Sequence, residues 1–419
     1  MHKNIKKVHI LQKYSSKTAI LCPFFSNFAA QFAILCTLAD IIIFNMVKKK
    51  ITFILNPISG TTSKAGIPAL IDEVLDKERF EYTIAETQRA GHASELAREA
   101  AANGIDIVVA VGGDGTVNEV ARALVETPAA LGIIPCGSGN GLARHLMLPM
   151  NARGALEMIN KCEIHTLDYG CINGMPFFCT CGMGFDAFIS MKFANAGKRG
   201  PITYVENVLK EGLKYKPETY EIEDETGTKQ YKAFLISIAN ASQYGNDAYI
   251  APQASMRDGL MDVIIMEPFD VLEAAQVSID MFNKTIDKNS KIKTFRSKHI
   301  HIHRSQPGVI HYDGDPIMAD ADLDITIREQ GINVIVNGDA DKTKRQPTKV
   351  QSAFSSFLSS IHQARIDVLD VMKGASAEVS GAVKDAKSEV TDVVKDAKTE
   401  VSTAIKEGKE TLKKLSPLK

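Results

Sequence analysis

An alternation of short apolar segments with longer amphipathic ones, between residues 51 and 134, is the feature that most constrains the fold. Four segments have the length and composition of strands: 51–55, 80–85, 105–111 and 130–134. Three segments between them carry apolar residues at the spacing of a helix face: 67–77, 93–103 and 116–126. Buried strands that alternate with helices are typical of a parallel sheet covered on both faces. We therefore expect an α/β domain over residues 46–165.

The pattern changes after residue 165, where strand-like segments separated by turn-forming residues dominate. These segments are 176–181, 219–223, 231–238, 261–266, 298–303, 309–313, 323–328 and 332–336. One helical segment, 271–284, interrupts the series. Such a series favours an antiparallel sandwich, so we expect a β-sandwich domain over residues 166–338. A cleft between two domains is a common place for a ligand.

Residues 1–45 fit neither domain. Their apolar stretch, 29–44, is interrupted by Gln31 and Asp40 and is shorter than the roughly 20 residues that span a bilayer. We interpret them as an extension that precedes a natural start at Met46, rather than as an anchor. The formal net charge of −1 argues against a general nucleic-acid binder. We expect the seven scattered cysteines to be reduced thiols of a cytoplasmic protein.

Residues 339–419 form a polar linker and a helical tail. An eleven-residue repeat begins at Glu378, Glu389 and Glu400, and eleven residues complete three helical turns with about 20° of drift. The repeat therefore places Val and Ala on one face, with lysines such as Lys387 and Lys398 beside it. The pattern fits shallow binding to an anionic membrane, hence peripheral association with its inner face. It fits a solvated helix, a coiled-coil arm or a disordered tail equally well.

The segment that carries most of the chemistry is Gly112-Gly113-Asp114-Gly115-Thr116. A buried strand ends there and a helix begins at once, which places backbone amides where phosphates bind in open α/β folds. A carboxylate in such a loop would repel a bare phosphate. Asp114 therefore suits binding Mg²⁺ through water or accepting a proton from an attacking hydroxyl. The alternative is a glycine turn in which the aspartate caps a helix.

Three more loops follow strands of the same predicted sheet. Asn56-Pro57-Ile58-Ser59-Gly60 follows the first strand, and Thr87 and His92 follow the second. Gly137-Ser138-Gly139-Asn140 follows the fourth, with the positive charge of Arg144 close behind. Because the carboxyl ends of parallel strands share one edge, we expect a nucleotide pocket there, built from Ser59, Gly112, Gly115 and Asn140 among others.

Together these motifs resemble the diacylglycerol kinase catalytic-domain family, which includes bacterial soluble lipid kinases, ceramide kinases and sphingosine kinases. The resemblance covers residues 46–337 and extends to Gly184-Phe185-Asp186-Ala187, Asp258-Gly259-Leu260-x-Asp262 and Asp313-Gly314-Asp315. It implies a Rossmann-like N-terminal domain of the NAD kinase and diacylglycerol kinase type, a β-sandwich C-terminal domain and an active site between them. It also implies ATP and Mg²⁺ as cofactors.

The resemblance assigns roles to individual residues. ATP-binding positions would be Asn56, Thr87, Gly113, Thr116 and Ser138. Asp114 matches the general base proposed in sphingosine kinases, and Asp315 matches a family glutamate near the γ-phosphate. A structural Mg²⁺ site, as in bacterial members of the family, would combine the Asp258 side chain with the main-chain carbonyls of Ser255 and Leu260. Because Asp315 is one methylene shorter than glutamate, the choice of base between Asp114 and Asp315 stays open.

The acceptor is predicted less sharply. Asp186 is a candidate for the lipid head group, or else a helix cap, and Ile189, Phe193, Val205 and Val208 are candidates for an acyl-chain groove. Diacylglycerol, a sphingoid base or ceramide would each fit, and a homodimer stays open. An NAD kinase-like enzyme and a non-catalytic lipid-binding scaffold are the alternatives. His299, His301 and His303 alternate along one strand, and we interpret them as structural.

Overall fold

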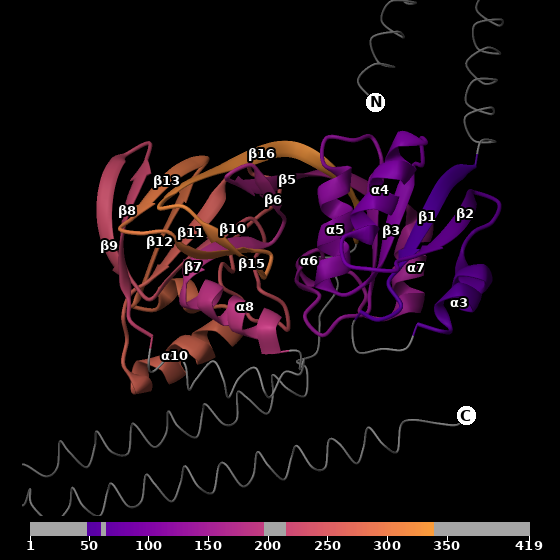
Figure 1. Ribbon diagram of the computed structural model, residues 1–419. Helices are drawn as coiled ribbons and strands as arrows, with labels where there is room; N and C mark the ends of the chain where they lie inside the picture. The colour runs from indigo at the N-terminus through magenta and orange to yellow at the C-terminus, as the bar shows by residue number, and fades with distance from the viewer. Residues whose placement is uncertain (1–47, 60–63, 197–214, 339–419) are drawn as a thin grey trace, which may run out of the picture. The chain divides into compact units, whose positions relative to one another are not determined.

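The computed structural model describes residues 48–59, 64–196 and 215–338 (Figure 1). The extension 1–45, the tail 339–419 and two groove candidates, Val205 and Val208, lie outside these ranges. Contacts divide the chain into two units. Of the smaller unit, residues 48–50 and 76–81 are described, and within it the Lys49 amide donates to the Arg79 carbonyl at 2.9 Å. The larger unit holds all other described residues.

The N-terminal half has the alternating order that the sequence predicts. Its strands are β1 (Lys49–Leu55), β2 (Phe80–Glu86), β3 (Ile107–Gly112) and β4 (Ala130–Pro135). Its helices are α3 (Ile67–Val74), α4 (His92–Ala102), α5 (Asp114–Leu124), α6 (Gly141–His145) and α7 (Ala152–Lys161). The sheet order is β2-β1-β3-β4, and β3 pairs in parallel with both β1 and β4.

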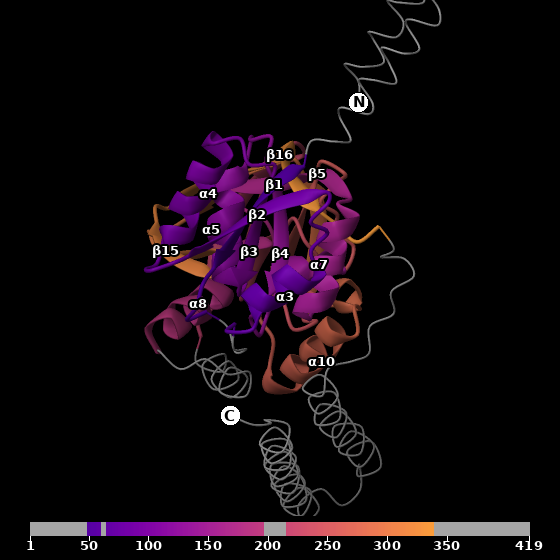
Figure 2. The ribbon, with the colours of Figure 1, turned by 90° about the vertical axis from the view of Figure 1, so that its right-hand side faces the viewer.

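Burial explains why this sheet forms. Every residue of β3 and β4 is buried, as expected for strands covered on both faces. Helices α4 and α5 lie on one side of the sheet and α3 and α7 on the other (Figure 2). Helix α5 buries Val117, Val120 and Leu124 from successive turns. The carboxyl ends of the parallel strands β1, β3 and β4 therefore share one edge, which is where the glycine loops begin.

The C-terminal half continues the first sheet and adds a second one. The long strand β16 (Asp322–Ile335) pairs in parallel with β4 and antiparallel with β5 (Ile164–Ile172). It also pairs with β13 (His299–Arg304), which leads to β8 (Glu218–Asp224) and β9 (Gly227–Ala233). The short strand β6 (Met175–Phe177) pairs with β5. The predicted segments 323–328 and 332–336 are thus one strand, with an irregularity between Arg328 and Ile332.

The second sheet has the order β12-β11-β10-β7-β14-β15. Its strands are β7 (Thr180–Gly184), β10 (Leu235–Ala239), β11 (Met261–Met266), β12 (Ile292–Ser297), β14 (Gly308–Tyr312) and β15 (Asp315–Ala319). Side chains from both sheets, including Met183, Ile236 and Ile302, form one buried cluster. The expected α/β domain followed by a β-sandwich is confirmed.

Some expected elements differ from the observed ones. The predicted strand 231–238 is two strands in different sheets, β9 and β10, because the chain changes sheet at Phe234. The predicted strand 176–181 is likewise divided between β6 and β7. Helix α8 (Phe185–Ala196) was not predicted, whereas α10 (Val271–Phe282) matches the helical segment expected there. In the part of the chain that the structure describes, no helix has the length and apolar character needed to cross a bilayer.

Candidate active site

Helix α5 begins directly at the end of β3, with Asp114 as its first residue. Its N-cap residue is Gly113, and no side chain within the described ranges caps this end. By contrast, α7 is capped by Asn151, and α10 has a capping box of Asp270 and Glu273. The first turn of a helix leaves N–H groups without intrahelical partners, and an anion satisfies them well. A phosphate therefore has ready donors at the start of α5.

The loop after β1 contacts this helix start. The Asn56 side-chain amide donates to Thr116 Oγ1 at 3.0 Å, while Asn56 Oδ1 accepts the Ser59 amide at 3.2 Å. A Cβ atom on Gly112 would lie 2.5 Å from Thr116 Oγ1 and 2.9 Å from Ser59 Oγ. Since such distances are not tolerated, only glycine fits at position 112. Predicted ATP-binding residues from two different loops are thus brought together.

Asp114 joins the loop after β3 to the loop after β4. Its Oδ2 accepts the Asn140 amide at 2.8 Å and its Oδ1 accepts the Gly141 amide at 2.7 Å. A Cβ atom on Gly139 would lie 2.8 Å from Asp114 Oδ2, so this approach needs a glycine. The carboxylate binds the amides that lead into α6 instead of capping its own helix. An ionised carboxylate has about four acceptor positions, so two amides do not saturate it.

The loop after β4 is held largely by its own residues. Asn140 is buried, and its side chain accepts the Gly137 amide at 3.0 Å and donates to the Gly137 carbonyl at 2.8 Å. Ser138 is exposed. Arg144, the positive charge expected close to this loop, is buried and pairs with Asp247 at 2.9 Å. Of the polar residues predicted in this loop, Ser138 is the more accessible to a nucleotide.

The loop after β2 is fixed by the same helix, α5. Thr87 is buried, and its amide donates to the Leu55 carbonyl at 2.9 Å. Glu119, on the second turn of α5, accepts the amides of Gly91 and Ala93, both at 3.1 Å. His92 Nδ1 accepts the Gln88 amide at 3.1 Å. Helix α5 therefore touches the loops that follow β1, β2 and β4.

Asp313-Gly314-Asp315 forms the turn between β14 and β15, and its two aspartates differ in environment. Asp313 accepts the amides of Phe178, Cys179 and Thr180 at 2.8, 2.6 and 3.2 Å. Burial raises the pKa of its carboxyl to about 6, although the three amide donors oppose the rise. Asp313 thus fixes the connection between β6 and β7.

Asp315 is exposed and pairs with Arg122 of α5 at 3.1 Å. The Arg122 guanidinium also lies over the Tyr312 ring, 4.4 Å from its centroid. Arg122 follows Asp114 by eight residues, which is about 12 Å along a helix axis. Of the two candidate bases, Asp114 is therefore the first residue of α5, whereas Asp315 pairs with a residue near the other end of this helix. Arg122 was not predicted, because its partners Asp315 and Tyr312 lie 193 and 190 residues away in the chain.

Asp186, the candidate for the lipid head group, lies in a polar cluster at the start of α8. Its Oδ2 accepts the Tyr244 hydroxyl at 3.2 Å and pairs with His311 Nε2 at 3.0 Å. Its Oδ1 accepts the Ala187 amide at 2.8 Å, as a capping side chain would. Of the groove candidates, Ile189 is buried, and the side chain of Phe193 is outside the described part. Tyr244 and His311 were not predicted.

The predicted metal loop contains one carboxylate near a competing cation. Asp258 Oδ1 accepts the Leu260 amide at 3.2 Å, and Asp258 Oδ2 lies 3.6 Å from Arg296 Nη1. Ser255 Oγ accepts the Arg257 amide at 3.3 Å. Within the described ranges, no three His, Cys, Asp or Glu side chains are arranged to hold a metal. One carboxylate with carbonyl oxygens and water still suits Mg²⁺, which commonly keeps several waters.

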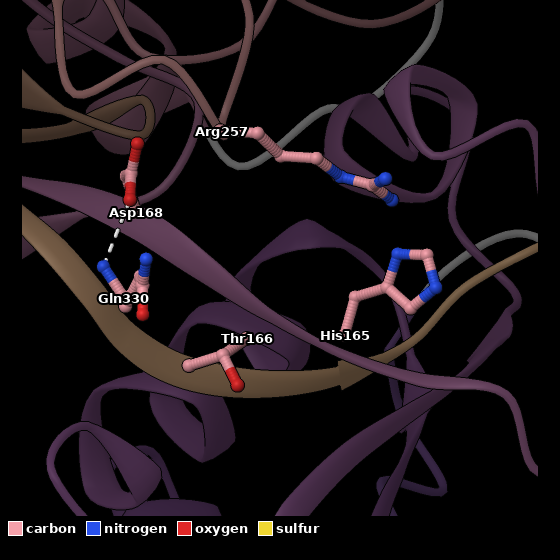
Figure 3. Close-up of a pocket in the computed structure, with 5 residues that line it drawn as sticks. All are labelled: His165, Thr166, Asp168, Arg257 and Gln330. Carbon is pink, nitrogen blue, oxygen red and sulfur yellow. Dashed lines mark hydrogen bonds between the residues drawn. The ribbon is translucent and has the colours of Figure 1, made fainter. Parts of the chain in front are cut away.

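A separate cavity of about 350 Å³ lies between β5, β16 and the loop before β11 (Figure 3). Its lining residues are His165, Thr166, Asp168, Arg257 and Gln330. Asp168 is buried, and its two oxygens accept the amides of Gly259 and Gln330 at 2.9 and 2.8 Å. No residue of the glycine loops lines this cavity. We therefore place the candidate site at the start of α5 and assign Asp168 the support of the 255–260 loop.

The alternating histidines of β13 pair with carboxylates on β16. His299 pairs with Asp324 at 2.5 Å, and His301 and His303 pair with Asp322 at 3.3 and 2.8 Å. All three side chains are exposed at the sheet surface, away from the glycine loops. These pairs fit the structural interpretation of the three histidines.

Two family models match successive parts of the chain. The diacylglycerol kinase catalytic domain matches residues 50–172, and the YegS C-terminal NAD kinase beta sandwich-like domain matches residues 179–336. A diacylglycerol kinase of Bacillus subtilis is 26% identical over 273 residues, which are 64% of this chain and 90% of that protein. The probable lipid kinase YegS-like of Chromohalobacter salexigens is 29% identical over 236 residues, 55% of this chain and 76% of that protein.

Solved structures agree with this fold. A diacylglycerol kinase of Bacillus anthracis aligns with a TM-score of 0.55 at 20% identity, covering 70% of this chain and 98% of that chain. At this level of identity, the likeness shows the fold alone.

Proposed function

The chain belongs to the diacylglycerol kinase catalytic-domain family, and from that premise we propose that it is a lipid kinase. In this proposal it transfers the γ-phosphoryl group of MgATP to a hydroxyl of diacylglycerol or of a related lipid alcohol. The observation that carries the proposal is the start of α5, which no side chain of the described residues caps and which meets three loops at one edge of the parallel sheet. Phosphoryl transfer depends mainly on positioning and charge neutralisation, and this arrangement suits both.

The nucleotide phosphates would bind the backbone amides at the start of α5. Gly115 is exposed, and a Cβ atom there would meet open space, so the backbone is accessible to a ligand. Ser138 offers an exposed hydroxyl from the loop after β4. The Mg²⁺ of MgATP would neutralise the phosphate oxygens. We propose a second, structural Mg²⁺ held by Asp258 with the main-chain carbonyls of Ser255 and Leu260.

We assign the proton acceptor to Asp315. Its carboxylate is exposed, and among the described residues Arg122 is its hydrogen-bond partner. Both oxygens of Asp114 already accept loop amides, which favours a role in holding the two glycine loops together. Asp186 would bind the acceptor hydroxyl, because it is a carboxylate on the β-sandwich half near the Asp313–Asp315 turn. The contact of Asp186 with His311, on the strand before that turn, supports this placement.

The proposed acceptor and the sequence of the tail together suggest a location in the cell for the enzyme. A diacylglycerol-like substrate resides in a membrane, so the enzyme must approach a bilayer surface. We propose a cytoplasmic protein that associates peripherally with the inner face of the membrane. The lysine-flanked repeat of residues 378–410 would contribute the binding.

The test is phosphate transfer from radiolabelled ATP with Mg²⁺ to diacylglycerol, a sphingoid base, ceramide and NAD, each offered separately. Label on one or more lipids supports the proposal. Label on NAD alone would replace the lipid kinase proposal with an NAD kinase-like function. NAD is included as an acceptor because the second matching domain is named NAD kinase beta sandwich-like. Nucleotide binding without transfer to any acceptor would favour a lipid-binding scaffold.

A further inference from the structure

The loop of residues 243–249 contacts both the candidate nucleotide loop and the candidate acceptor carboxylate. The loop is closed by an isolated bridge between Gln243 and Tyr249, and the Tyr244 amide donates to the Ala248 carbonyl at 3.0 Å. Gly245, Asn246 and Asp247 have φ values of 111°, 52° and 61°. Two of these three are not glycine, but asparagine and aspartate are the other residue types that readily adopt this conformation, which suits a tight turn.

Two contacts join this loop to the loop after β4 (Gly137–Gly141, the second glycine loop), and Arg144 of α6 adds a hydrogen bond to the Gly139 carbonyl oxygen. A Cβ atom on Gly245 would lie 3.0 Å from the Gly139 backbone, so the two chains touch directly. The Asn246 amide donates to the Gly139 carbonyl at 3.2 Å, and Arg144 Nε donates to the same oxygen at 2.8 Å.

The Arg144–Asp247 pair fixes this contact. Its two groups are 2.9 Å apart and only 10% and 9% exposed. A buried ion pair is costly to break, since the remaining charge is left without a partner. The second glycine loop is therefore held from the β-sandwich half by this pair.

The opposite end of the loop reaches the acceptor site. The Tyr244 hydroxyl donates to Asp186 Oδ2 at 3.2 Å, and His311 pairs with the same oxygen. On its other side, Gly139 lies against Asp114, which accepts the amides of Asn140 and Gly141. A continuous series of contacts thus runs from Asp186 through Tyr244 and Gly139 to Asp114.

We propose that the 243–249 loop couples acceptor binding to nucleotide binding, with Tyr244 and Asp247 as its positioning residues. The inference rests on the proposed function, because it assigns Asp186 to the acceptor and the Gly137–Gly141 loop to the nucleotide. An acceptor hydroxyl at Asp186 changes the environment of Tyr244 Oη, and the loop transmits that change to Gly139. Because coupling between two binding sites is reciprocal, bound nucleotide must then raise acceptor affinity by the same factor.

The first test measures the affinity of a non-hydrolysable ATP analogue with Mg²⁺, with and without detergent-dispersed lipid acceptor. In the wild-type protein, we expect the acceptor to tighten nucleotide binding about 5-fold or more, within the usual range of coupling between sites. Tyr244→Phe removes the hydroxyl and keeps the ring. In this variant we expect the ratio of nucleotide affinities with and without acceptor to fall to about one. An unchanged ratio in Tyr244→Phe would overturn the coupling.

The second test uses Asp247→Asn, with Asp247→Glu as the conservative variant. Asp247→Asn removes the charge that pairs with Arg144, and we expect the KM for ATP to rise about 10-fold or more. Asp247→Glu retains a carboxylate and is expected to recover part of that loss. The matched control is Glu73→Gln, which breaks the exposed ion pair between Glu73 and Arg153. This variant should leave the KM for ATP unchanged.

Thermal unfolding separates positioning from stability. If Asp247→Asn lowers the unfolding temperature but leaves the KM for ATP at the wild-type value, the positioning role is wrong. A wild-type protein that phosphorylates no lipid overturns the proposed function, and this inference with it. An active wild type in which Tyr244→Phe keeps the full ratio overturns the coupling alone.

Discussion

Asp114 Oδ1 accepts the backbone amide of Gly141 at 2.7 Å, so one side chain holds the loop after β3 against the loop after β4. Its Oδ2 accepts the neighbouring amide of Asn140 at 2.8 Å. A carboxylate can accept both amides, whereas a side-chain amide has only one oxygen for them. The site therefore requires an acid at this position even if the acid transfers no proton.

Asp114→Asn is expected to lower both stability and activity. Its NH₂ group would face one of the two backbone amides, so one buried donor would lose its acceptor. The free energy of unfolding should fall by about 1–3 kcal/mol, and lipid phosphorylation should fall by more than 100-fold. Chemical denaturation and the radiolabel assay measure the two effects. Full stability combined with lost activity would instead indicate a purely chemical role for Asp114.

Asp315 is expected to show the opposite balance. Its side chain is exposed and, among the described residues, pairs with the partly exposed Arg122. Asp315→Asn should therefore change stability by less than about 1 kcal/mol. If Asp315 accepts the proton, kcat should fall by about 100-fold or more. Asp315→Glu, which keeps a carboxylate and adds the methylene that the family resemblance implies at this position, should retain activity within a few-fold. Asp320→Asn, at another exposed position of the same hairpin region, is the control. Wild-type kcat in Asp315→Asn would remove Asp315 from the mechanism.

The sequence predicted the glycine loops well, because their signals are local. A buried strand, a run of small residues and a helix start are all adjacent in the chain, as at Gly112–Thr116. The parallel sheet then requires such loops to share one edge, and the observed contacts of Asn56 with Thr116 and of Asp114 with Asn140 agree. The motifs around Asp315 and Asp186 also identified these two residues as candidates, and their roles stay predictions.

Contacts between distant segments could not be predicted in the same way. Arg122 and Asp315 are 193 residues apart, and Arg144 and Asp247 are 103 apart. No local pattern distinguishes such a charge from an ordinary surface residue, so the partners of Arg122 and Arg144 could not be named from the sequence. The division of the predicted strand 231–238 into β9 and β10 at Phe234 was not predicted, for a related reason. Residues on both sides of it suit a strand, and only packing between the two sheets decides where the chain crosses.

The metal assignment is tested through Asp258 and through the residue that supports its loop. Asp258→Asn should raise the Mg²⁺ concentration needed for half-maximal activity by about 10-fold, since one charged ligand is lost. It should also reduce the Mg²⁺-dependent rise in unfolding temperature, which is a readout without turnover. A variant that keeps both Mg²⁺ responses of the wild type would show that Asp258 is not a ligand.

Asp168→Asn separates loop support from metal binding. Asp168 is 2% exposed and binds the amides of Gly259 and Gln330, so the change leaves a buried donor unsatisfied. Stability should fall by about 1–3 kcal/mol with or without Mg²⁺. A loss of stability that appears only in the presence of Mg²⁺ would instead make Asp168 part of the metal site.

Deletion of residues 351–419 tests the proposed membrane contact of the tail. The shortened protein should bind anionic vesicles more weakly, because several near-surface lysines each contribute up to about 1 kcal/mol. Its turnover of detergent-dispersed lipid should stay near that of the full chain, since all proposed site residues precede residue 339. Equal partitioning of both proteins onto phosphatidylserine vesicles would contradict the proposal, and neutral vesicles serve as the control.

Acid sensitivity is expected from His145, at the end of α6. Its Nδ1 accepts the Ser242 amide at 3.1 Å and lies 3.0 Å from the Ser242 hydroxyl, so this nitrogen carries no proton in the fold. Burial, and to a smaller degree the charge of Arg257, lower the pKa of His145 from 6.5 to about 4.

Between these two pKa values the unfolded chain binds more protons than the folded one, so stability must rise with pH across that window. A shift of this size corresponds to about 3 kcal/mol of stability, fully present above pH 6.5 and lost as the pH falls toward 4. His145→Gln keeps an acceptor for the Ser242 amide but does not titrate. The difference in unfolding free energy between wild type and variant, measured by denaturation from pH 5 to 7.5, should therefore shift in favour of the variant as the pH falls. A pH-independent difference would show that His145 titrates equally in the folded and unfolded chains.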